Sequence, residues 1–146
     1  MRSSLQVATC LFNLASILKA EGKFEEAHAL YRKVLKIRRK CCGEDHDMYA
    51  DTLVNVANVY MEQKEFEEAL KLQQQASEIY VRMLGENSFK SSTIRSSIAI
   101  TQHQLGNHKI AHDEAKRAVR MFRQLGEVQN PWYFNAVNIL ESYGKQ

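Results

Sequence analysis

An internal repeat with a period of 42 residues constrains the fold of this chain more than any other feature of its sequence. Shifting the sequence by that period aligns residues 11–15 with 53–57 and residues 24–27 with 66–69, without a gap between the two matches. Repeats of about 20 to 50 residues are typical of solenoids, in which each unit buries its apolar face against its neighbours. The repeat therefore predicts a stack of similar units and not one globular core.

The repeat continues, more weakly, through the rest of the chain. A third copy keeps Ala99 and Ala111 where the second copy has Ala57 and Ala69. A truncated fourth copy follows it, because residues 138–143 are similar to part of the second copy. The repeats are expected at residues 5–46, 47–88 and 89–129, followed by a terminal helix at 131–143.

Apolar residues recur with a helical period inside each copy. Leu11, Leu14 and Leu18 lie at i, i+3 and i+7, the spacing of one apolar helix face. A breaker such as Gly22 or Gly106 follows, and a second amphipathic stretch then begins, so each copy is expected to form a hairpin of two helices. One proline and six glycines are too few for the turns of a β-sandwich or barrel. First helices are expected at 5–21, 47–63, 90–105 and 131–143, and second helices at 24–41, 66–84 and 108–125.

Charge and cysteine content limit the class of protein further. Basic residues outnumber acidic ones by 20 to 17, and the net charge of +3 is only a weak indication of an anionic partner. The three cysteines are an odd number without framework spacing, which favours a reducing compartment. The sequence has no apolar run of about 18 residues and no apolar leader after Met1. We therefore expect a cytoplasmic protein without a membrane-spanning segment.

A set of small, aliphatic and aromatic residues recurs around each hairpin. They are Leu14, Ala15, Leu18, Gly22, Phe24, Ala27, Tyr31 and Val34 in the first copy, and Val56, Ala57, Tyr60, Phe66, Ala69 and Ala76 in the second. This pattern resembles the tetratricopeptide repeat (TPR) family. The 42-residue period, the Asn-Leu-Ala core at 13–15 and the Gly-Glu-Asp-His connector at 43–46 are similar to the kinesin-light-chain type of repeat. The resemblance implies an all-α, right-handed superhelical TPR solenoid of antiparallel helix hairpins, forming a single TPR domain over residues 1–146.

The resemblance also implies that the first helices line a concave groove, which binds an extended peptide or a helix of a partner protein. Carried over position by position, the residues expected in this partner-binding groove are Thr9, Phe12, Asn13, Ser16, Lys19, Asp51, Val54, Asn55, Asn58, Met61, Thr93, Ser96, Ser97, Ile100 and His103. Asparagine side chains both donate and accept hydrogen bonds. The recurrent Asn13 and Asn55 therefore either contact a ligand or bond neighbouring repeats.

Two departures from the family pattern affect the expected ligand. Some TPR domains grip a C-terminal carboxylate with Lys and Asn at two first-helix positions. Those positions hold Phe12 and Ser16, Val54 and Asn58, and Ser96 and Ile100, of which only Asn58 fits. A carboxylate clamp is therefore not expected. Phe12, Val54 and Ser96 also replace the first Asn of the paired Asn-Asn typical of kinesin light chains, which predicts a more apolar groove.

The sequence contains no catalytic signature, and we expect neither an enzyme nor a bound cofactor. The glycines are isolated, so no Gly-rich loop is present to hold a phosphate. His108 and His112, with Asp113 beside them, lie on one helix but lack a further ligand at metal-binding spacing. Cys41 and Cys42 end a helix as apolar packing residues, so we expect no zinc site there.

Basic residues crowd the ends of two second helices. One cluster contains Lys33, Lys36, Arg38, Arg39 and Lys40, and the other contains Lys116, Arg117, Arg120 and Arg123. Cations near a helix C-terminus stabilise the helix dipole, which explains part of each cluster. The surplus leaves an acidic peptide, a membrane surface or RNA as alternatives. Aromatic residues are not interleaved with the basic ones, and we expect no nucleic-acid and no membrane partner.

Taken together, these patterns predict a protein–protein interaction module whose partner is a protein or peptide. The alternative is a structural role, as a self-associating unit or a segment of a longer TPR solenoid. The ends of the stack lack polar caps, and Trp132, Tyr133 and Phe134 are aromatic for a terminal helix. Binding of nucleic acid or an acidic partner through the basic helix ends is the third choice.

Overall fold

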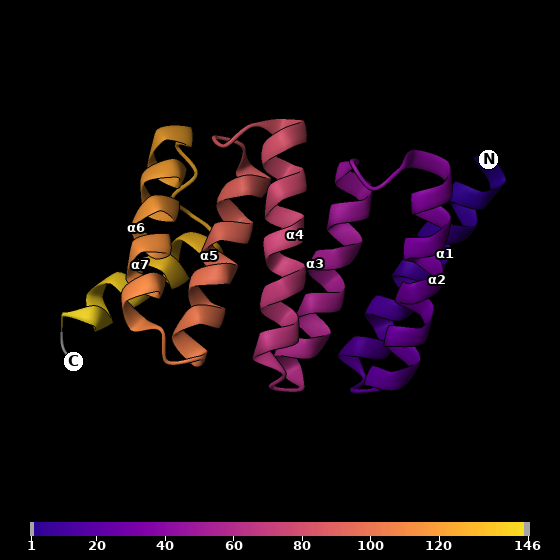
Figure 1. The fold of residues 1–146 in the computed structure, drawn as a ribbon, viewed down its shortest axis with the longest axis horizontal. Coiled ribbons are helices and arrows are strands. Elements are labelled where there is room, and N and C mark those ends of the chain that lie inside the picture. The colour runs from indigo at the N-terminus through magenta and orange to yellow at the C-terminus, as the bar shows by residue number, and fades with distance from the viewer. Residues whose placement is uncertain (1, 145–146) are drawn as a thin grey trace.

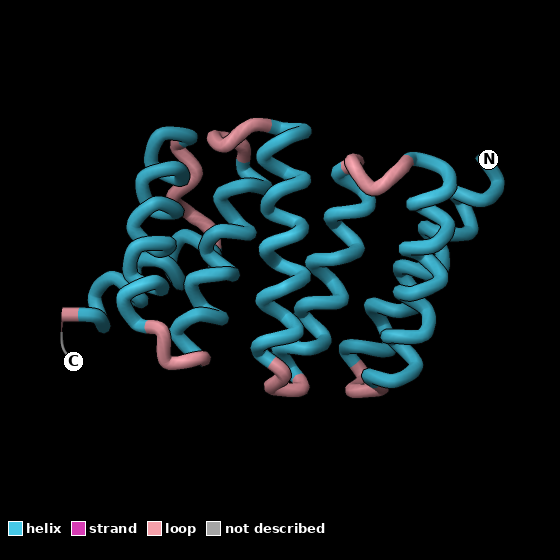
Figure 2. Tube along the Cα trace, viewed as in Figure 1, coloured by secondary structure: helices cyan, strands magenta, loops and turns pink. Residues whose placement is uncertain are grey.

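A computed structural model of the protein describes residues 2–144, and every regular element in that range is an α-helix (Figure 2). The helices are α1 (Arg2–Ala20), α2 (Phe24–Cys42), α3 (Asp47–Glu62), α4 (Phe66–Leu84), α5 (Phe89–Gln104), α6 (His108–Leu125) and α7 (Pro131–Tyr143). Their ends differ from the predicted ranges by at most three residues, at the start of α1. The predicted all-α fold is confirmed. Met1, Lys145 and Gln146, which the expected domain included, lie outside the described residues.

The three hairpins turn through the same tight connection. Gly22 and Gly106 have φ angles of 78° and 84°, in the left-handed region that glycine favours. At the matching position of the second hairpin, Lys64 has a φ of 62°. In each turn the next amide donates to the carbonyl five residues earlier, as Glu65 N does to Tyr60 O at 2.9 Å. The predicted breakers therefore form one type of turn, which Lys64 adopts despite its side chain.

Side chains cap the helices that begin each later repeat. His46, Ser88 and Asn130 precede α3, α5 and α7, and each accepts a hydrogen bond from a backbone amide in the first turn, at 2.8–3.1 Å. These bonds satisfy amides that have no partner within the helix. Pro131 follows the cap of α7 as its first residue, as the sequence predicts.

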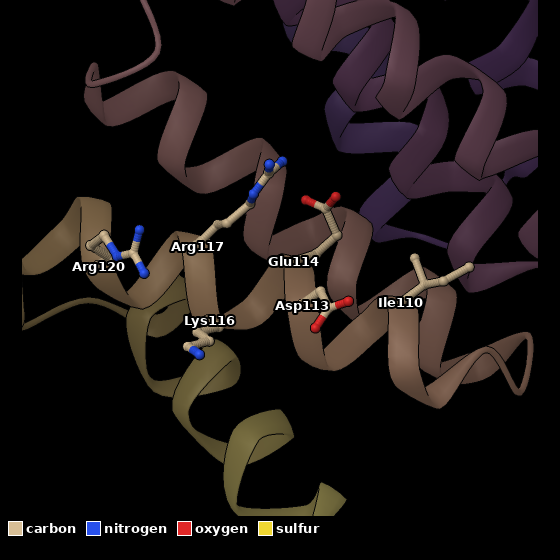
Figure 3. A pocket seen from close by; sticks show the side chains of 6 residues that line it. All are labelled: Ile110, Asp113, Glu114, Lys116, Arg117 and Arg120. Carbon is tan, nitrogen blue, oxygen red and sulfur yellow. The ribbon is translucent and has the colours of Figure 1, made fainter.

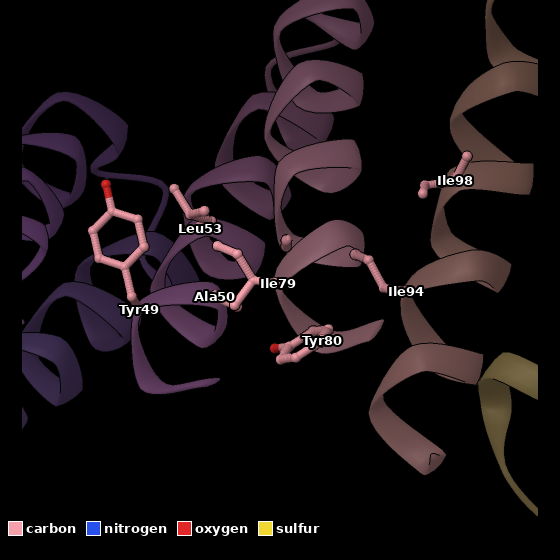
Figure 4. Close-up of a cluster of buried hydrophobic side chains, with 8 residues drawn as sticks. Tyr49, Ala50, Leu53, Ile79, Tyr80, Ile94 and Ile98 are labelled. Atoms are coloured by element: carbon pink, nitrogen blue, oxygen red, sulfur yellow. The ribbon is translucent and has the colours of Figure 1, made fainter. Parts of the chain in front are cut away.

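Small residues bring the two helices of each hairpin together. The facing alanine pairs, all fully buried, are Ala15 and Ala27, Ala57 and Ala69, and Ala99 and Ala111. Larger apolar side chains then join one hairpin to the next. One cluster contains Leu53 of α3, Ile79 of α4 and Ile94 of α5 (Figure 4). Because this cluster draws residues from two hairpins, neighbouring repeats share their core, as expected of a solenoid.

The hairpins stand side by side in one row, with the N-terminus at one end and the C-terminus at the other (Figure 1). Each helix packs on the next one along the chain, and two first helices also contact the next first helix, α1 with α3 and α5 with α7. Within residues 2–144, no comparable contact joins α2 to α4 or α4 to α6. At the two ends of the row, the first helices therefore approach each other more closely than the second helices do, while α3 and α5 meet only through side chains such as Asp51 and Lys90.

Candidate binding surface on the first helices

The first helices α1, α3 and α5 carry polar residues on corresponding faces. Thr9 and Asn13 are four residues apart on α1, and Asn55 and Asn58 are three apart on α3, spacings that place side chains on one helix face. Ser97 of α5 holds the repeat position of Asn13 and Asn55. Thr9 and Asn13 are exposed, and the other three are half-buried. We call these five residues, Thr9, Asn13, Asn55, Asn58 and Ser97, the polar row.

The hydrogen bonds of the polar row stay within its own helices. Thr9, Asn55 and Ser97 each donate a side-chain hydrogen bond to the carbonyl four residues earlier, at 2.9–3.2 Å. Within residues 2–144, no side-chain hydrogen bond links Asn13, Asn55 or Asn58 to a neighbouring hairpin. Of the two roles open to these asparagines, bonding between repeats is therefore absent from the described structure.

The apolar residues expected in the groove pack partly between helices. The ring of Phe12 lies 5.8 Å from that of Tyr31 in α2, measured between centroids. Val54 packs against the cluster that joins α3, α4 and α5, and Ile100 packs against the core of the third hairpin. Met61 places its sulfur 3.2 Å from a threonine hydroxyl of α5. All four groove residues are half-buried, so each keeps only part of its surface beside the polar row.

The remaining expected residues occupy different environments. Ser96 is fully buried, and its hydroxyl donates to a backbone carbonyl of α7 at 2.6 Å, so it fastens α7 to α5 and does not line an open surface. Ser16 is half-buried, with its hydroxyl 3.0 Å from a tyrosine hydroxyl of α2. His103 Nδ1 lies 3.2 Å from His108 Nδ1. Lys19 is half-buried near the end of α1.

Asp51 lies at the centre of a charged network that sequence reasoning missed. Tyr80 Oη donates to Asp51 Oδ1 at 2.5 Å, and Lys90 Nζ donates to both Asp51 oxygens at 3.0 Å and to Asp47 Oδ2 at 3.3 Å. Burial, and then the hydrogen bond to Asp51, raises the pKa of the Tyr80 phenol. Burial lowers the pKa of Lys90, but the hydrogen bonds and charges of Asp51 and Asp47 outweigh it, and the pKa rises. The network ties α3, α4 and α5 together.

Arg38 forms the corresponding link between the first two hairpins. Its Nη1 donates to the carbonyl of Met48 at 2.9 Å and to Thr52 Oγ1 at 2.6 Å, and its guanidinium lies 4.9 Å from the centroid of the Phe12 ring. Only 5% of Arg38 is exposed, although the sequence places it in a cluster of basic residues near the end of a second helix. Tyr80 holds the same repeat position one period later. The sequence therefore contained a signal for these links between hairpins, because two copies place a polar residue at the same repeat position.

The histidines considered as metal ligands are occupied by other contacts. His112 stacks on Tyr143, with ring centroids 4.4 Å apart, and its Nδ1 lies 3.5 Å from Asp113. No group of three or more His, Cys, Asp or Glu side chains within residues 2–144 is arranged to hold a metal ion. In the same range, no helix combines the length and apolar character needed to cross a bilayer.

Most of the surface cavities lie along α6, the second helix of the third hairpin. Four of the five cavities described here are lined by residues of α6, and the fifth, of about 610 Å³, lies on α1 and includes Thr9 of the polar row. Apart from Thr9, no residue of the polar row lines these five open depressions.

Stacked antiparallel hairpins that share their core define a helical-repeat protein of the solenoid class. A tetratricopeptide repeat family model matches residues 48–124, and a second tetratricopeptide repeat model matches residues 7–47. The first match alone covers more than half of the chain. The chain belongs to the tetratricopeptide repeat family.

Individual relatives support the expected resemblance to kinesin light chains. The chain is 26% identical over 133 residues to Protein KINESIN LIGHT CHAIN-RELATED 2 of Arabidopsis thaliana, a match that covers 90% of this chain and 20% of that protein. BtubC (BKLC) from P. vanneervenii has a TM-score of 0.82 at 21% identity, covering 94% of this chain and 56% of that one. TPR-like repeats of a Podosopora anserina protein described as a kinesin light chain have a TM-score of 0.82 at 17% identity, covering 98% and 67%. The structural matches show the fold, and the chain spans about a fifth of its curated relative's length.

Proposed function

We propose that this chain is a non-enzymatic binding module that takes an extended segment of a partner protein along the polar row. The proposal rests on one observation. Within residues 2–144, the side chains of Asn13, Asn55 and Asn58 make no hydrogen bond to another hairpin. Polar side chains held on rigid helices without a partner in another hairpin are suited to bind a ligand.

The packing of the helices supports the first-helix face as the inner face of the stack. First helices approach closely at α1 with α3 and at α5 with α7, and α3 meets α5 through the side chains of Asp51 and Lys90, while the described second helices have no comparable close approach. A row of units that approach more closely on one side curves toward that side. An elongated ligand lying along the inner face therefore reaches several repeats at once.

The chemistry of the polar row matches an extended peptide backbone. Such a backbone presents unpaired N–H and C=O groups, and an asparagine amide pairs with both kinds. The half-buried Phe12, Val54 and Ile100 offer apolar contact beside the amides. The helices are already ordered by their own packing, so the module loses little conformational entropy when it binds.

The same proposal includes a reducing compartment, such as the cytoplasm, as the place where the chain works. Cys10, Cys41 and Cys42 are free thiols, which fits a reducing compartment such as the cytoplasm. The similarity to kinesin light chain-related proteins fits a role as an adaptor that binds another protein.

A random peptide library displayed on phage, selected on the whole chain, tests this proposal. The affinity of the best peptide is then measured for the wild type and for the double variant Asn55→Ala with Asn58→Ala. We expect the affinity to fall about tenfold, equivalent to roughly 1.4 kcal/mol, because the peptide loses hydrogen-bond partners. Gln75→Ala with Gln129→Ala removes two exposed amides elsewhere and serves as the matched control.

Amide chemical shifts measured during the titration locate the ligand. Perturbations along α1, α3 and α5, together with a control variant of wild-type affinity, support the polar row. Equal affinities of the two double variants, perturbations confined to second helices, or a selection that yields no binding peptide would each contradict the proposal. Asn55 and Asn58 are better test positions than Val54, whose packing against the core makes Val54→Glu a risk to folding.

A second candidate function is association through the end of the stack. Leu14 and Ile17 on α1 are 46% and 56% exposed, whereas Val56 and Val59, at the same repeat positions of α3, are 8% and 0% exposed and pack beside α2. We infer that a helical hairpin of a second copy of this chain covers this face of α1. Sedimentation that shows an oligomer, and its loss in Ile17→Glu, supports this function. A wild-type chain that remains monomeric at every concentration counts against self-association.

A further inference from the structure

The third hairpin carries an ion pair where the other two hairpins carry leucines. The facing repeat positions of the first and second helices are held by Leu11 and Leu30, by Leu53 and Leu72, and by Arg95 and Glu114. Leu72 packs against the buried cluster that contains Leu53. Arg95 Nη1 instead donates to Glu114 Oε2 at 2.9 Å, and the two side chains are 14% and 22% exposed. A charged pair has thus replaced an apolar one at the same place in the fold.

This replacement lies at the bottom of an open cleft between α4 and α6. One cavity, of about 500 Å³, is lined by Glu78 of α4, Arg95 and Ile98 of α5, and Glu114 of α6. A second, of about 340 Å³, shares Arg95 and continues toward the start of α5. We call the two cavities the Arg95 cleft. It lies away from the polar row, because Arg95 is two residues removed from Ser97 and projects to another face of α5.

The donors of Arg95 are not all used by the protein. Its Nε is buried and has no hydrogen-bond partner within the described structure. Arg117 and Arg120 of α6 line the second cavity together with Arg95, and Glu86 contributes the one carboxylate there. Within residues 2–144, no ion pair engages Arg117 or Arg120. Since Arg95 is already paired with Glu114, Arg117 and Arg120 against Glu86 leave this end of the cleft with an excess of positive charge.

The other cavity of the cleft has a different character, because Ile110 and the carboxylates of Glu78 and Glu114 line it, and Asp113 lies beside Ile110 on α6. In Figure 3, Arg117 and Arg120 lie toward one end of α6, and Ile110 and Asp113 lie toward the other. Ile110 is 49% exposed. A ligand that follows α6 therefore meets cations at one end, and an apolar side chain and a carboxylate at the other.

We propose that the Arg95 cleft binds an acidic segment of a partner protein, with its carboxylates against Arg95, Arg117 and Arg120 and an apolar side chain against Ile110. Planar guanidinium groups bind carboxylates through paired hydrogen bonds and favour them when partly desolvated. A nucleic-acid backbone is uniformly anionic and would be repelled by the carboxylates at the other end of the cleft. The cleft also lacks aromatic side chains on which bases stack.

A short fluorescent peptide of repeated Glu-Glu-Leu units, titrated against the whole chain, is the probe for this site. We expect saturable binding, weaker or absent for the matching Gln-Gln-Leu peptide. Arg117→Glu with Arg120→Glu is expected to lower the affinity about tenfold or more, because it reverses two cations of the cleft. Lys33→Glu with Lys36→Glu changes the same repeat positions of α2 by the same charge and is expected to retain binding.

A second variant tests the contribution of Arg95 without changing the net charge. Arg95→Leu with Glu114→Leu restores the leucine pair of the other hairpins and is expected to weaken peptide binding while the helices stay folded. Unchanged affinity in this variant would overturn the assignment of Arg95. Equal losses in the α2 and α6 charge variants, absence of saturable binding, or tighter binding of a single-stranded oligonucleotide through the same arginines would overturn the proposed partner.

Discussion

Lys64 has the same left-handed backbone conformation as Gly22, with φ angles of 62° and 78° at matching positions of two hairpin turns. A side chain in this conformation brings Cβ close to the following carbonyl and costs about 1 kcal/mol or more. Gly22 avoids the cost, and a Cβ added to it meets no atom within 4 Å. The two turns therefore differ in the strain of their backbones.

Lys64→Gly is expected to stabilise the protein by about 0.5–1 kcal/mol, because the relief of strain exceeds the added flexibility of the unfolded chain. Gly22→Lys is the reciprocal change and is expected to destabilise by a similar amount. Urea unfolding followed by circular dichroism measures both. A loss of stability in Lys64→Gly would show that the lysine side chain makes a stabilising contribution that the strain does not cancel.

The Arg95–Glu114 pair leads to a prediction about stability in addition to binding. Partly buried ion pairs lose hydration, and replacing both partners by apolar residues is often neutral or stabilising. Arg95→Leu alone is expected to cost about 1–3 kcal/mol, because it leaves the Glu114 carboxylate partly buried without its partner. Arg95→Leu with Glu114→Leu is expected to recover at least the wild-type stability. A double variant less stable than both single variants in a thermal unfolding cycle would refute this account.

The buried alanines limit the size of side chain between the helices of a hairpin. Ala69 is fully buried against α3, so Ala69→Leu is expected to overpack the contact at a cost of about 1–3 kcal/mol. Ala20→Leu makes the same change at an exposed position of α1 and is expected to leave stability nearly unchanged. An unchanged melting midpoint in Ala69→Leu would contradict the close packing of α3 and α4.

The helices and their order could be predicted because each copy repeats the same local signals. Apolar spacing, the buried alanines and breakers such as Gly22 act within one hairpin, so a single sequence contains them. The turn at Lys64 was also predicted, although from its position in the repeat and not from its residue type. Local rules favour glycine there, and the packing of the hairpin imposes the conformation on lysine.

The surface was predicted less well because it depends on contacts between copies. Ser96 follows the repeat position of Phe12 and Val54, yet it is fully buried because α7 packs directly over it. Tyr80 and Lys90 come from different helices and meet only at Asp51, so neither stands out within its own segment. The comparison of copies does contain one overlooked signal. A leucine pair that becomes Arg95 and Glu114 in the third copy is a paired change, which identifies facing positions without a structure.

Tyr80 makes the stability of the fold sensitive to alkaline pH. Burial and the hydrogen bond to Asp51 raise its pKa, so the unfolded chain loses the phenol proton at a lower pH than the folded chain does. Above the ordinary tyrosine pKa of about 10, the unfolded state therefore binds fewer protons, and the free energy of unfolding falls as pH rises. The contribution of one group to this slope is at most about 1.4 kcal/mol per pH unit.

Tyr80→Phe removes this proton and is expected to give a shallower fall in stability above about pH 10 than the wild type shows. A residual slope remains, because burial also raises the pKa of Tyr31 and the carboxylates raise that of Lys90. Urea unfolding at a series of alkaline pH values measures the slopes, with Tyr143→Phe, at the exposed end of α7, as the matched control. Parallel stability curves for Tyr80→Phe and the wild type would show that the Tyr80 phenol ionises equally easily in the folded and unfolded states, and would contradict the raised pKa.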